Sequence, residues 1–183
     1  MRYFFPVFFI IFCVAGISQG QEHGTQPSSF WPPLTASVKI TQSLDFCGEP
    51  LDLGSQALRE RLEKELLLTI WDRPQVVLWI KRTTRYLPII EKMLRENEMP
   101  DDLKYVAIAE SALRPHVGSL KGAIGFWQFL RSTGQKYGLR INAEIDERRN
   151  IFASTLAAIN YFKDLYQMLD SWTLAAAAYN MGE

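Results

Sequence analysis

Apolar residues recur every three or four positions through most of the chain after Ser55, and no segment alternates apolar with polar residues as a half-buried strand does. Ser55 is a good helix N-cap, and it predicts a helix to about residue 70. Asp72 and Pro88 mark two further helix starts, the last helix ending near Asn97. The spacing therefore predicts an all-α fold, in which helices over 55–97 precede a second helical segment.

Composition fits a soluble globular protein and excludes several classes of function. Of the 183 residues, 48% are apolar, and twenty Lys and Arg balance twenty Asp and Glu. A net charge of zero lacks the basic excess that nucleic-acid binding needs. Two Cys and two His provide little material for a metal site, so we expect neither a metal nor another cofactor.

The first twenty residues have the pattern of an export signal. A positive start precedes an apolar run from Tyr3 to Ile17, which is too short to span a bilayer. Residues 1–20 are predicted to be a signal peptide cleaved after Gly20; in the alternative, an uncleaved anchor holds the protein at the membrane. Both predict an exported protein of the periplasm or cell envelope. Residues 21–54, rich in Ser, Gln, Gly and Pro, are predicted to be a linker or surface wrap.

Glu110 lies on the apolar face of a helix predicted to start at Pro100. The residues that share its face are Leu103, Val106, Ala107 and Leu113. Burial disfavours a charged carboxylate, so we expect a raised pKa, as a general acid needs near neutrality. The alternative is a structural ion pair of Glu110 with Arg114 or Lys104.

The segment 118–130 combines glycines with an amide and aromatic rings. Its glycines predict a loop that lets the backbone approach a ligand, followed by a short apolar helix carrying Trp127, Gln128 and Phe129. An amide and an aromatic face suit a sugar. In the alternative interpretation the loop is an ordinary turn and the two rings are core.

Two more helices complete the pattern. The stripe of Phe152, Leu156, Ile159, Phe162, Tyr166 and Leu169 predicts a long structural helix. Asp170 or Ser171 caps the next helix, whose end carries Tyr179 and Asn180. These two residues either end the helix and fill the core, or face the same cleft as Glu110.

Three motifs together resemble the lytic transglycosylases of the lysozyme-like superfamily. Glu110-Ser111 resembles their catalytic Glu-Ser, residues 122–129 their Gly-x-x-Gly-x-x-Gln block, and 178–182 their Ala-Tyr-Asn-x-Gly. The resemblance covers about 55–183, with the SLT domain over 98–183, and is closest to the membrane-bound murein type. Arg131 departs from it, standing where the family usually has Pro. Because the family's domain continues past the last motif, we expect that domain to be incomplete at Glu183.

The resemblance also implies the site. Glu110 becomes the acid and base, and the substrate contacts become Ser119, Gln128, Tyr179 and Asn180. The partner is the peptidoglycan glycan strand, and the expected reaction is non-hydrolytic cleavage between N-acetylmuramic acid and N-acetylglucosamine, leaving 1,6-anhydromuramic ends.

Two other classes of function stay open. A hydrolytic muramidase needs a second carboxylate, for which Glu144, Asp146 and Glu147 are candidates. A peptidoglycan-binding protein without activity would keep the cleft and lack turnover. Oligomeric state is outside what the sequence predicts.

Overall fold

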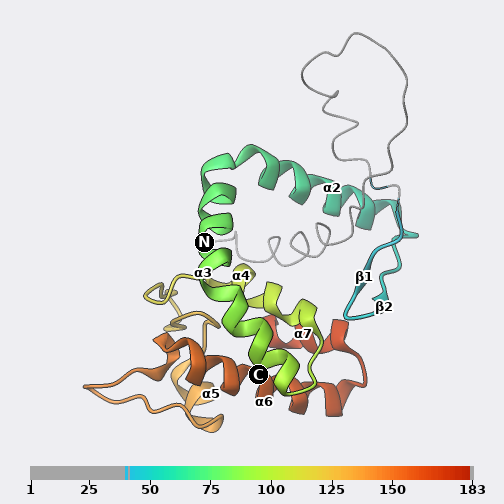
Figure 1. Ribbon diagram of the computed structural model, residues 1–183. Helices are drawn as coiled ribbons and strands as arrows, with labels where there is room; N and C mark the ends of the chain where they lie inside the picture. The colour runs from blue at the N-terminus through green and yellow to red at the C-terminus, as the bar shows by residue number, and fades with distance from the viewer. Residues whose placement is uncertain (1–39, 41, 182–183) are drawn as a thin grey trace.

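A computed structural model describes residues 40 and 42–181, so the predicted signal peptide and most of the predicted linker lie outside the described residues. The described part is predominantly helical, as predicted, with one small hairpin (Figure 1). Its elements are β1 (Asp45–Phe46), β2 (Glu49–Pro50), α2 (Gln56–Trp71), α3 (Arg73–Glu96), η3 (Asp101–Leu103), α4 (Lys104–Ser111), α5 (Arg131–Lys136), η4 (Glu147–Arg149), α6 (Ile151–Leu169) and α7 (Trp172–Met181). Within these residues no helix has both the length and the apolarity to cross a bilayer.

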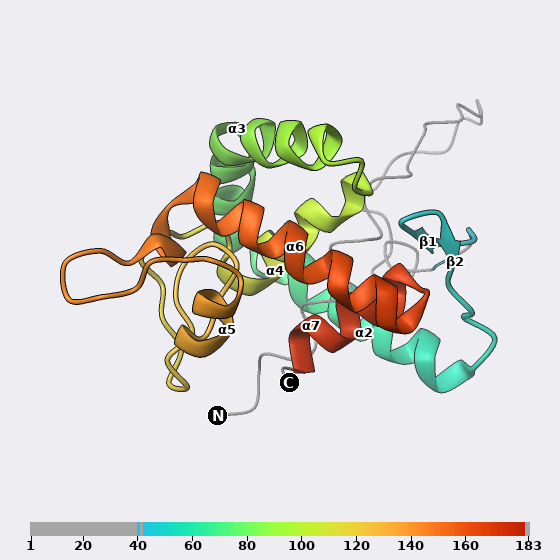
Figure 2. The same ribbon diagram turned by 90° about the horizontal axis from the view of Figure 1, so that it is seen from below.

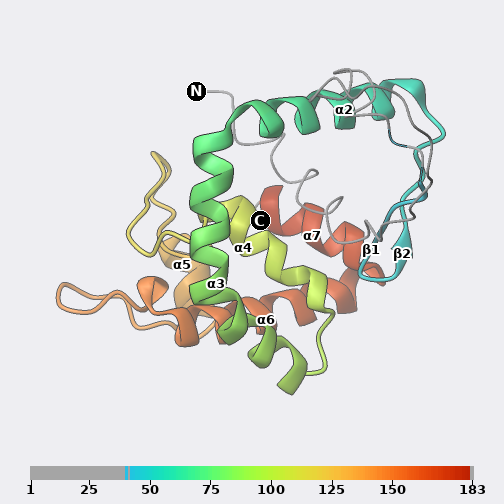
Figure 3. The same cartoon turned by 45° about the horizontal axis from the view of Figure 1, so that its top comes forward.

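The N-terminal helices begin and end close to where the sequence places them. Ser55 occupies the N-cap of α2, and Asp72 caps α3 by accepting a hydrogen bond from the backbone N of Gln75 at 3.2 Å. Asn97 ends α3 and donates its side-chain amide to the carbonyl of Met93. Figure 3 shows α2 meeting α3 at a sharp corner.

The predicted helix start at Pro88 is wrong, because Pro88 lies inside α3. A proline inside a helix removes one backbone donor and crowds the preceding turn, which usually breaks the helix. Here the turns that follow are held by packing, with Ile90 and Leu94 completely or almost completely buried. Tertiary contacts of α3 therefore outweigh the local preference of the proline.

The expectation of no strand is wrong for the hairpin of β1 and β2. Phe46 pairs with Glu49 and Asp45 with Pro50, in strands too short to show any alternation in the sequence. Cys47 and Gly48 form the turn with positive φ angles of 55° and 78°. Phe46 is buried in the core, so this part of the predicted linker is attached to the helical body.

Helix α6 runs through the middle of the body and packs against α3 and α7 (Figures 1 and 2). Its predicted extent is confirmed, but its predicted buried stripe is only partly right. Phe152 and Leu156 are exposed, whereas Ile159 and Phe162 are buried. The full buried set is Ser154, Thr155, Ala157, Ala158, Ile159, Tyr161, Phe162 and Leu165. Small and polar residues are buried because the neighbouring helices approach this face closely.

The predicted short helix over residues 127–130 is also wrong. Ile124 bridges Gly118 on one side and Phe129 on the other, so the segment is a compact loop, and α5 begins only at Arg131. Gln128 adopts a left-handed φ of 48°, which is incompatible with a right-handed α-helix at this residue.

Candidate active site

Glu110 lies in the last turn of α4, on the face that the sequence predicts to be buried. Its four predicted neighbours on that face are completely buried, and Glu110 itself is 9% exposed. The helix stops one residue later, since Ala112 and Leu113 both take left-handed φ angles, 52° and 56°. These two left-handed residues turn the chain sharply just after the carboxylate. Two consecutive left-handed residues without glycine are uncommon.

Burial raises the pKa of the Glu110 carboxyl to about 7, and a hydrogen bond from Asn180 partly opposes that rise. Neither predicted ion-pair partner contacts it. Lys104 pairs instead with Glu91 and Asp101, and the Nε of Arg114 donates to the carbonyl of Ser111 at 3.1 Å. The carboxyl therefore sits in an apolar environment without a compensating cation among the described residues, and it is partly protonated at neutral pH.

Asn180 brings the C-terminal helix to this carboxyl. The Nδ2 of Asn180 lies 3.4 Å from Oε1 of Glu110, a long hydrogen bond. Ser171 accepts from the backbone N of Leu174 and so caps α7, as predicted. The structure therefore places two of the predicted site residues together.

Tyr179 has a different place from the one that the resemblance implies. Its side chain is buried and stacks on Phe162 with ring centroids 4.6 Å apart, and its hydroxyl donates to the carbonyl of Trp127 at 2.8 Å. The phenol thus ties α7 to the 118–130 loop, beneath the site.

Gln128 and Ser119 hold the same loop in shape. The Nε2 of Gln128 donates to the carbonyls of Val117 and Gly125, at 3.1 and 2.9 Å. The hydroxyl of Ser119 accepts from the backbone N of Ala123 at 3.1 Å. Both amide hydrogens of Gln128 are used within the loop, and its side-chain oxygen accepts no hydrogen bond among the described residues.

The aromatic rings of the loop form part of the core, so the interpretation that they meet a sugar is wrong. Trp127 and Phe129 are 1% and 3% exposed. The indole Nε1 of Trp127 donates to the hydroxyl of Thr155 on α6 at 3.0 Å. A buried Trp usually finds a partner for its N–H, and Thr155 on the buried face of α6 provides it for Trp127.

Ser111 links Glu110 to the loop, a role that residue type alone did not indicate. Its hydroxyl donates to the carbonyl of Phe126 at 2.8 Å and lies 3.1 Å from the carbonyl of Ala107 in its own helix. The serine beside the glutamate therefore sets the distance between α4 and the loop.

Arg148 is the residue that sequence reasoning missed. Its guanidinium is 4% exposed and binds Asp146 through two hydrogen bonds, of 2.8 and 2.7 Å. It also donates to the carbonyls of Gly122 and Phe129, at 3.0 and 3.1 Å. In the sequence it stands in a run of charges that looks exposed, so nothing marked it as the centre of the loop.

Gly125 makes this arrangement sterically feasible. A Cβ at this position would lie 1.9 Å from the carbonyl oxygen of Arg148, and its φ is +87°. Only glycine combines such an approach with this backbone conformation.

Two of the three candidates for a second carboxylate, Asp146 and Glu147, are bound to arginines. Arg148 holds the pKa of Asp146 below its usual value, and Arg140 does the same for Glu147. The chain between α5 and η4, which carries Glu144, projects from the body on the side away from α7 (Figures 1 and 3). Within the described part of the chain, no three His, Cys, Asp or Glu side chains are grouped to hold a metal ion.

The described domain is helical and buries Glu110, with Asn180 hydrogen-bonded to the carboxyl and with Ser111 bonded to a glycine-containing loop. These are the positions of the three motifs that resemble those of the transglycosylases. Residues 88–183 match the family described as "Transglycosylase SLT domain", beginning within α3, and the chain belongs to that family. It is similar to "Membrane-bound lytic murein transglycosylase D" of Escherichia coli (strain K12), at 36% identity over 75% of this chain and 30% of the relative. It is also similar to "Putative tributyltin chloride resistance protein" of Alteromonas sp. (strain M-1), at 30% identity over 58% of this chain and 53% of that protein. The chain thus spans about a third of the curated murein transglycosylase that it matches.

Proposed function

We propose that this protein is a peptidoglycan lytic transglycosylase, which cleaves the β-1,4 bond between N-acetylmuramic acid and N-acetylglucosamine. Membership of the SLT family and the similarity to a protein named as a murein transglycosylase support this class. The observation that carries the proposal is the Glu110 carboxyl, which is buried without a cationic partner among the described residues and has a pKa raised to about 7. Such a group can donate a proton and take one back at the same pH.

In the proposed reaction, protonated Glu110 donates its proton to the glycosidic oxygen as the bond from C1 to that oxygen breaks. The acetamido carbonyl of the substrate stabilises C1. The Glu110 carboxylate then takes the proton of the C6 hydroxyl of the same muramic acid, whose oxygen bonds to C1. A 1,6-anhydro ring forms, no water is consumed, and Glu110 is protonated again.

The lack of a second available carboxylate beside Glu110 among the described residues supports ring closure over hydrolysis. Hydrolysis with two acids needs carboxyl groups about 5–5.5 Å apart for retention or about 6.5–9.5 Å apart for inversion. Asp146 and Glu147 are bound to arginines, and no carboxylate hydrogen-bonds Glu110 within the described residues. An intramolecular hydroxyl can have an effective concentration of about 10⁵ M or more, so it can compete with water.

The remaining assignments are proposals of the same kind. We assign Asn180 to orienting the Glu110 carboxyl, and the free side-chain oxygen of Gln128 and the hydroxyl of Ser119 to contacting the sugar from the loop. Tyr179 supports them through the carbonyl of Trp127. We further propose the division into helices over 55–97 and an SLT domain over 98–183, and a location in the cell envelope.

Mass spectrometry of digested sacculi tests the proposal. We expect muropeptides ending in 1,6-anhydro-N-acetylmuramic acid, each one water lighter than the hydrolytic product. Reducing-end muramic acid as the main product would assign the protein to the muramidases. Binding to sacculi without any release would assign it to the non-catalytic binding proteins.

A further inference from the structure

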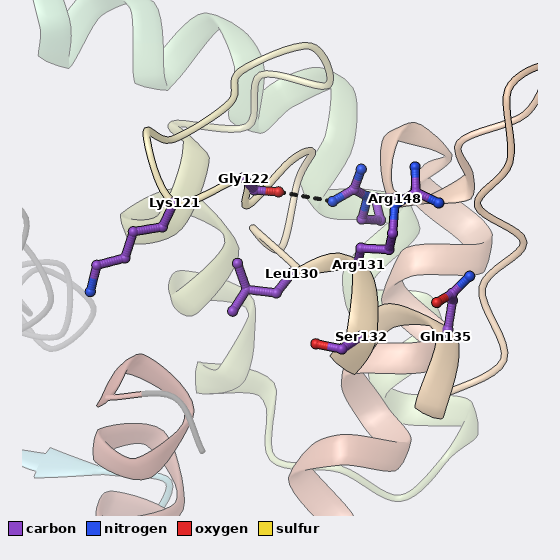
Figure 4. Close-up of a pocket in the computed structure, with 7 residues that line it drawn as sticks. All are labelled: Lys121, Gly122, Leu130, Arg131, Ser132, Gln135 and Arg148. Carbon is purple, nitrogen blue, oxygen red and sulfur yellow. Dashed lines mark hydrogen bonds between the residues drawn. The ribbon is translucent and has the colours of Figure 1, made fainter.

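A concave site lies where the 118–130 loop meets α5 and η4. It is a pocket of about 540 Å³, and Glu110 is not among the residues that line it. The lining consists of Lys121, Gly122, Leu130, Arg131, Ser132, Gln135 and Arg148 (Figure 4). Pockets of about 300–1,000 Å³ are the size that holds small ligands or single residues of a polymer.

The lining is cationic. It contains three basic residues and no carboxylate. Asp146 compensates the charge of Arg148, whereas Lys121 and Arg131 make no ion pair with any acid in the described part of the chain. Arg131 uses one nitrogen to donate to the carbonyl of Ile141 at 2.7 Å, which fixes the guanidinium, and its other N–H groups have no partner within residues 42–181. Figure 4 shows Lys121 and Arg131 extending to opposite sides of Leu130.

The charge around this pocket differs from that of the whole chain. Residues 112–149 contain seven Lys and Arg against three Asp and Glu, an excess of four positive charges in a chain whose net charge is zero. Two of the three acids are paired with Arg140 and Arg148. The surface of this segment therefore attracts anions.

The wall of the pocket is held in place before any ligand binds. Arg148 donates to the carbonyl of Gly122 at 3.0 Å, the bond drawn in Figure 4, and Gly125 packs against the backbone of Arg148. Because these pocket residues are already held in one conformation, they lose less conformational entropy when a ligand binds.

We propose that this pocket binds the acidic peptide that murein carries on its muramic acid, a proposal that rests on the proposed function. While the lactyl carboxyl of muramic acid is joined to the peptide as an amide, the N-acetylated sugars of the strand are uncharged, whereas the peptide carries free carboxylates. Its carboxylates reach Lys121 and Arg131, and its small alkyl side chains lie over Leu130, which is 39% exposed. In this proposal the loop contacts the sugar through Ser119 and Gln128 and the peptide through Lys121 and Leu130.

Binding measurements on the full chain with Glu110→Gln test the proposal, because the proposed mechanism predicts that this change prevents turnover. The probes are two glycan tetrasaccharides of the same sugars, one with tetrapeptides and one whose lactyl carboxyls are capped as methylamides, so that the bare glycan carries no charge. We expect the peptide-bearing probe to bind more tightly by about 4- to 25-fold at low salt, and less so at 0.5 M salt. Lys121→Gln and Arg131→Gln should each reduce that preference about two- to fivefold without changing the affinity for the bare glycan.

Lys121→Gln is the decisive variant, because the Lys121 side chain is exposed and makes no hydrogen bond among the described residues, so we expect the fold to be retained. Lys81→Gln, at an exposed lysine of α3 outside the pocket, is the matched control and should change nothing. Three results would overturn the proposal. They are equal affinity for the two probes, a preference for the peptide-bearing probe that Lys121→Gln leaves intact, and no binding of either probe. Anhydro products from both glycans at equal rates would leave the proposed function standing without the peptide site. Peptide preference without turnover by the unaltered chain would leave the site standing without the function.

Discussion

Asn180 places its amide 3.4 Å from the carboxyl of Glu110, although the two residues are 70 positions apart in the sequence. This pair joins the ends of α4 and α7, and the residues beside each of them hold the same loop. Ser111 binds the loop at Phe126, and Tyr179 binds it at Trp127. On each helix, one residue of an adjacent pair faces the candidate site and the other binds the loop: Glu110 and Ser111 on α4, and Asn180 and Tyr179 on α7.

Glu110→Gln should lower murein turnover by at least about 10²-fold, because it keeps the shape of the side chain and removes the proton that general acid catalysis needs. Release of soluble muropeptides from sacculi measures this loss. Glu144→Gln, at an exposed acid of the projecting segment, is the control and should retain activity. Comparable activity in Glu110→Gln would mean that another group supplies the proton.

Stability should fall as pH rises from about 4.5 to about 7. The pKa of Glu110 is about 7 in the folded protein and about 4.5 in the unfolded chain, so the folded state binds more protons in this window. The penalty is absent below pH 4.5 and complete above pH 7, where it reaches a few kcal/mol at most. Urea unfolding of the parent and Glu110→Gln at pH 4.5 and pH 8 measures it. We expect the variant to gain stability over the parent only at pH 8; an equal difference at both pH values would contradict the raised pKa.

Asn180→Ala should raise the pKa of Glu110 further, because the amide stabilises the charged carboxylate through its hydrogen bond. Carboxyl NMR titration of Glu110 reports the shift directly. A lower pKa in the variant would show that the amide opposes the charge instead of stabilising it.

Gly125→Ala should destabilise the protein by more than about 3 kcal/mol, because the new Cβ meets the carbonyl of Arg148 and the backbone is left-handed. Gly138→Ala separates the two causes. Gly138 has a φ of +89° but nothing within 4 Å of the added carbon, so only the conformational cost of about 1–2 kcal/mol remains. Thermal unfolding of both variants checks the difference, and equal losses would mean that the approach of Arg148 has no energetic weight.

Glu49→Gln should destabilise the protein by about 0.5–2 kcal/mol at neutral pH, through loss of a cap on α7. The Glu49 carboxylate accepts from the Ser171 hydroxyl and from the backbone N of Trp172 and Thr173. Desolvation acts to raise the pKa of Glu49, but these bonds outweigh it and lower the pKa to about 2. The stabilisation is therefore present above about pH 4.5 and lost as pH falls toward about 2.

Unfolding measured between pH 2 and pH 7 tests this cap. The difference between the parent and Glu49→Gln should vanish at the acid end. Glu96→Gln, in an exposed pair with Lys92, is the control and should change stability little. A loss in Glu49→Gln that does not depend on pH would contradict the role of the charge.

The sequence by itself determined the features that depend on neighbours within one or two turns. The start of α3 at Asp72, the end of α3 at Asn97 and the cap of α7 at Ser171 follow from local hydrogen bonding, which acts within a few residues. The start of α2 at Ser55 follows from the helical spacing of the apolar residues after it, since Ser55 makes no side-chain capping hydrogen bond. The burial of Glu110 follows from helical periodicity, since the residues that share its face lie three, four and seven positions away.

Only the tertiary structure decided which groups meet across the chain. It kept Pro88 inside α3, turned Gln128 left-handed, buried Arg148 in the loop and brought Glu49 to the start of α7. It also turned the Tyr179 hydroxyl toward Trp127 and the Asn180 amide toward Glu110. Each of these outcomes depends on contacts between residues far apart in the sequence. The free energies of these contacts exceed the local conformational preferences of the residues, and the contacts leave no periodic pattern in the sequence.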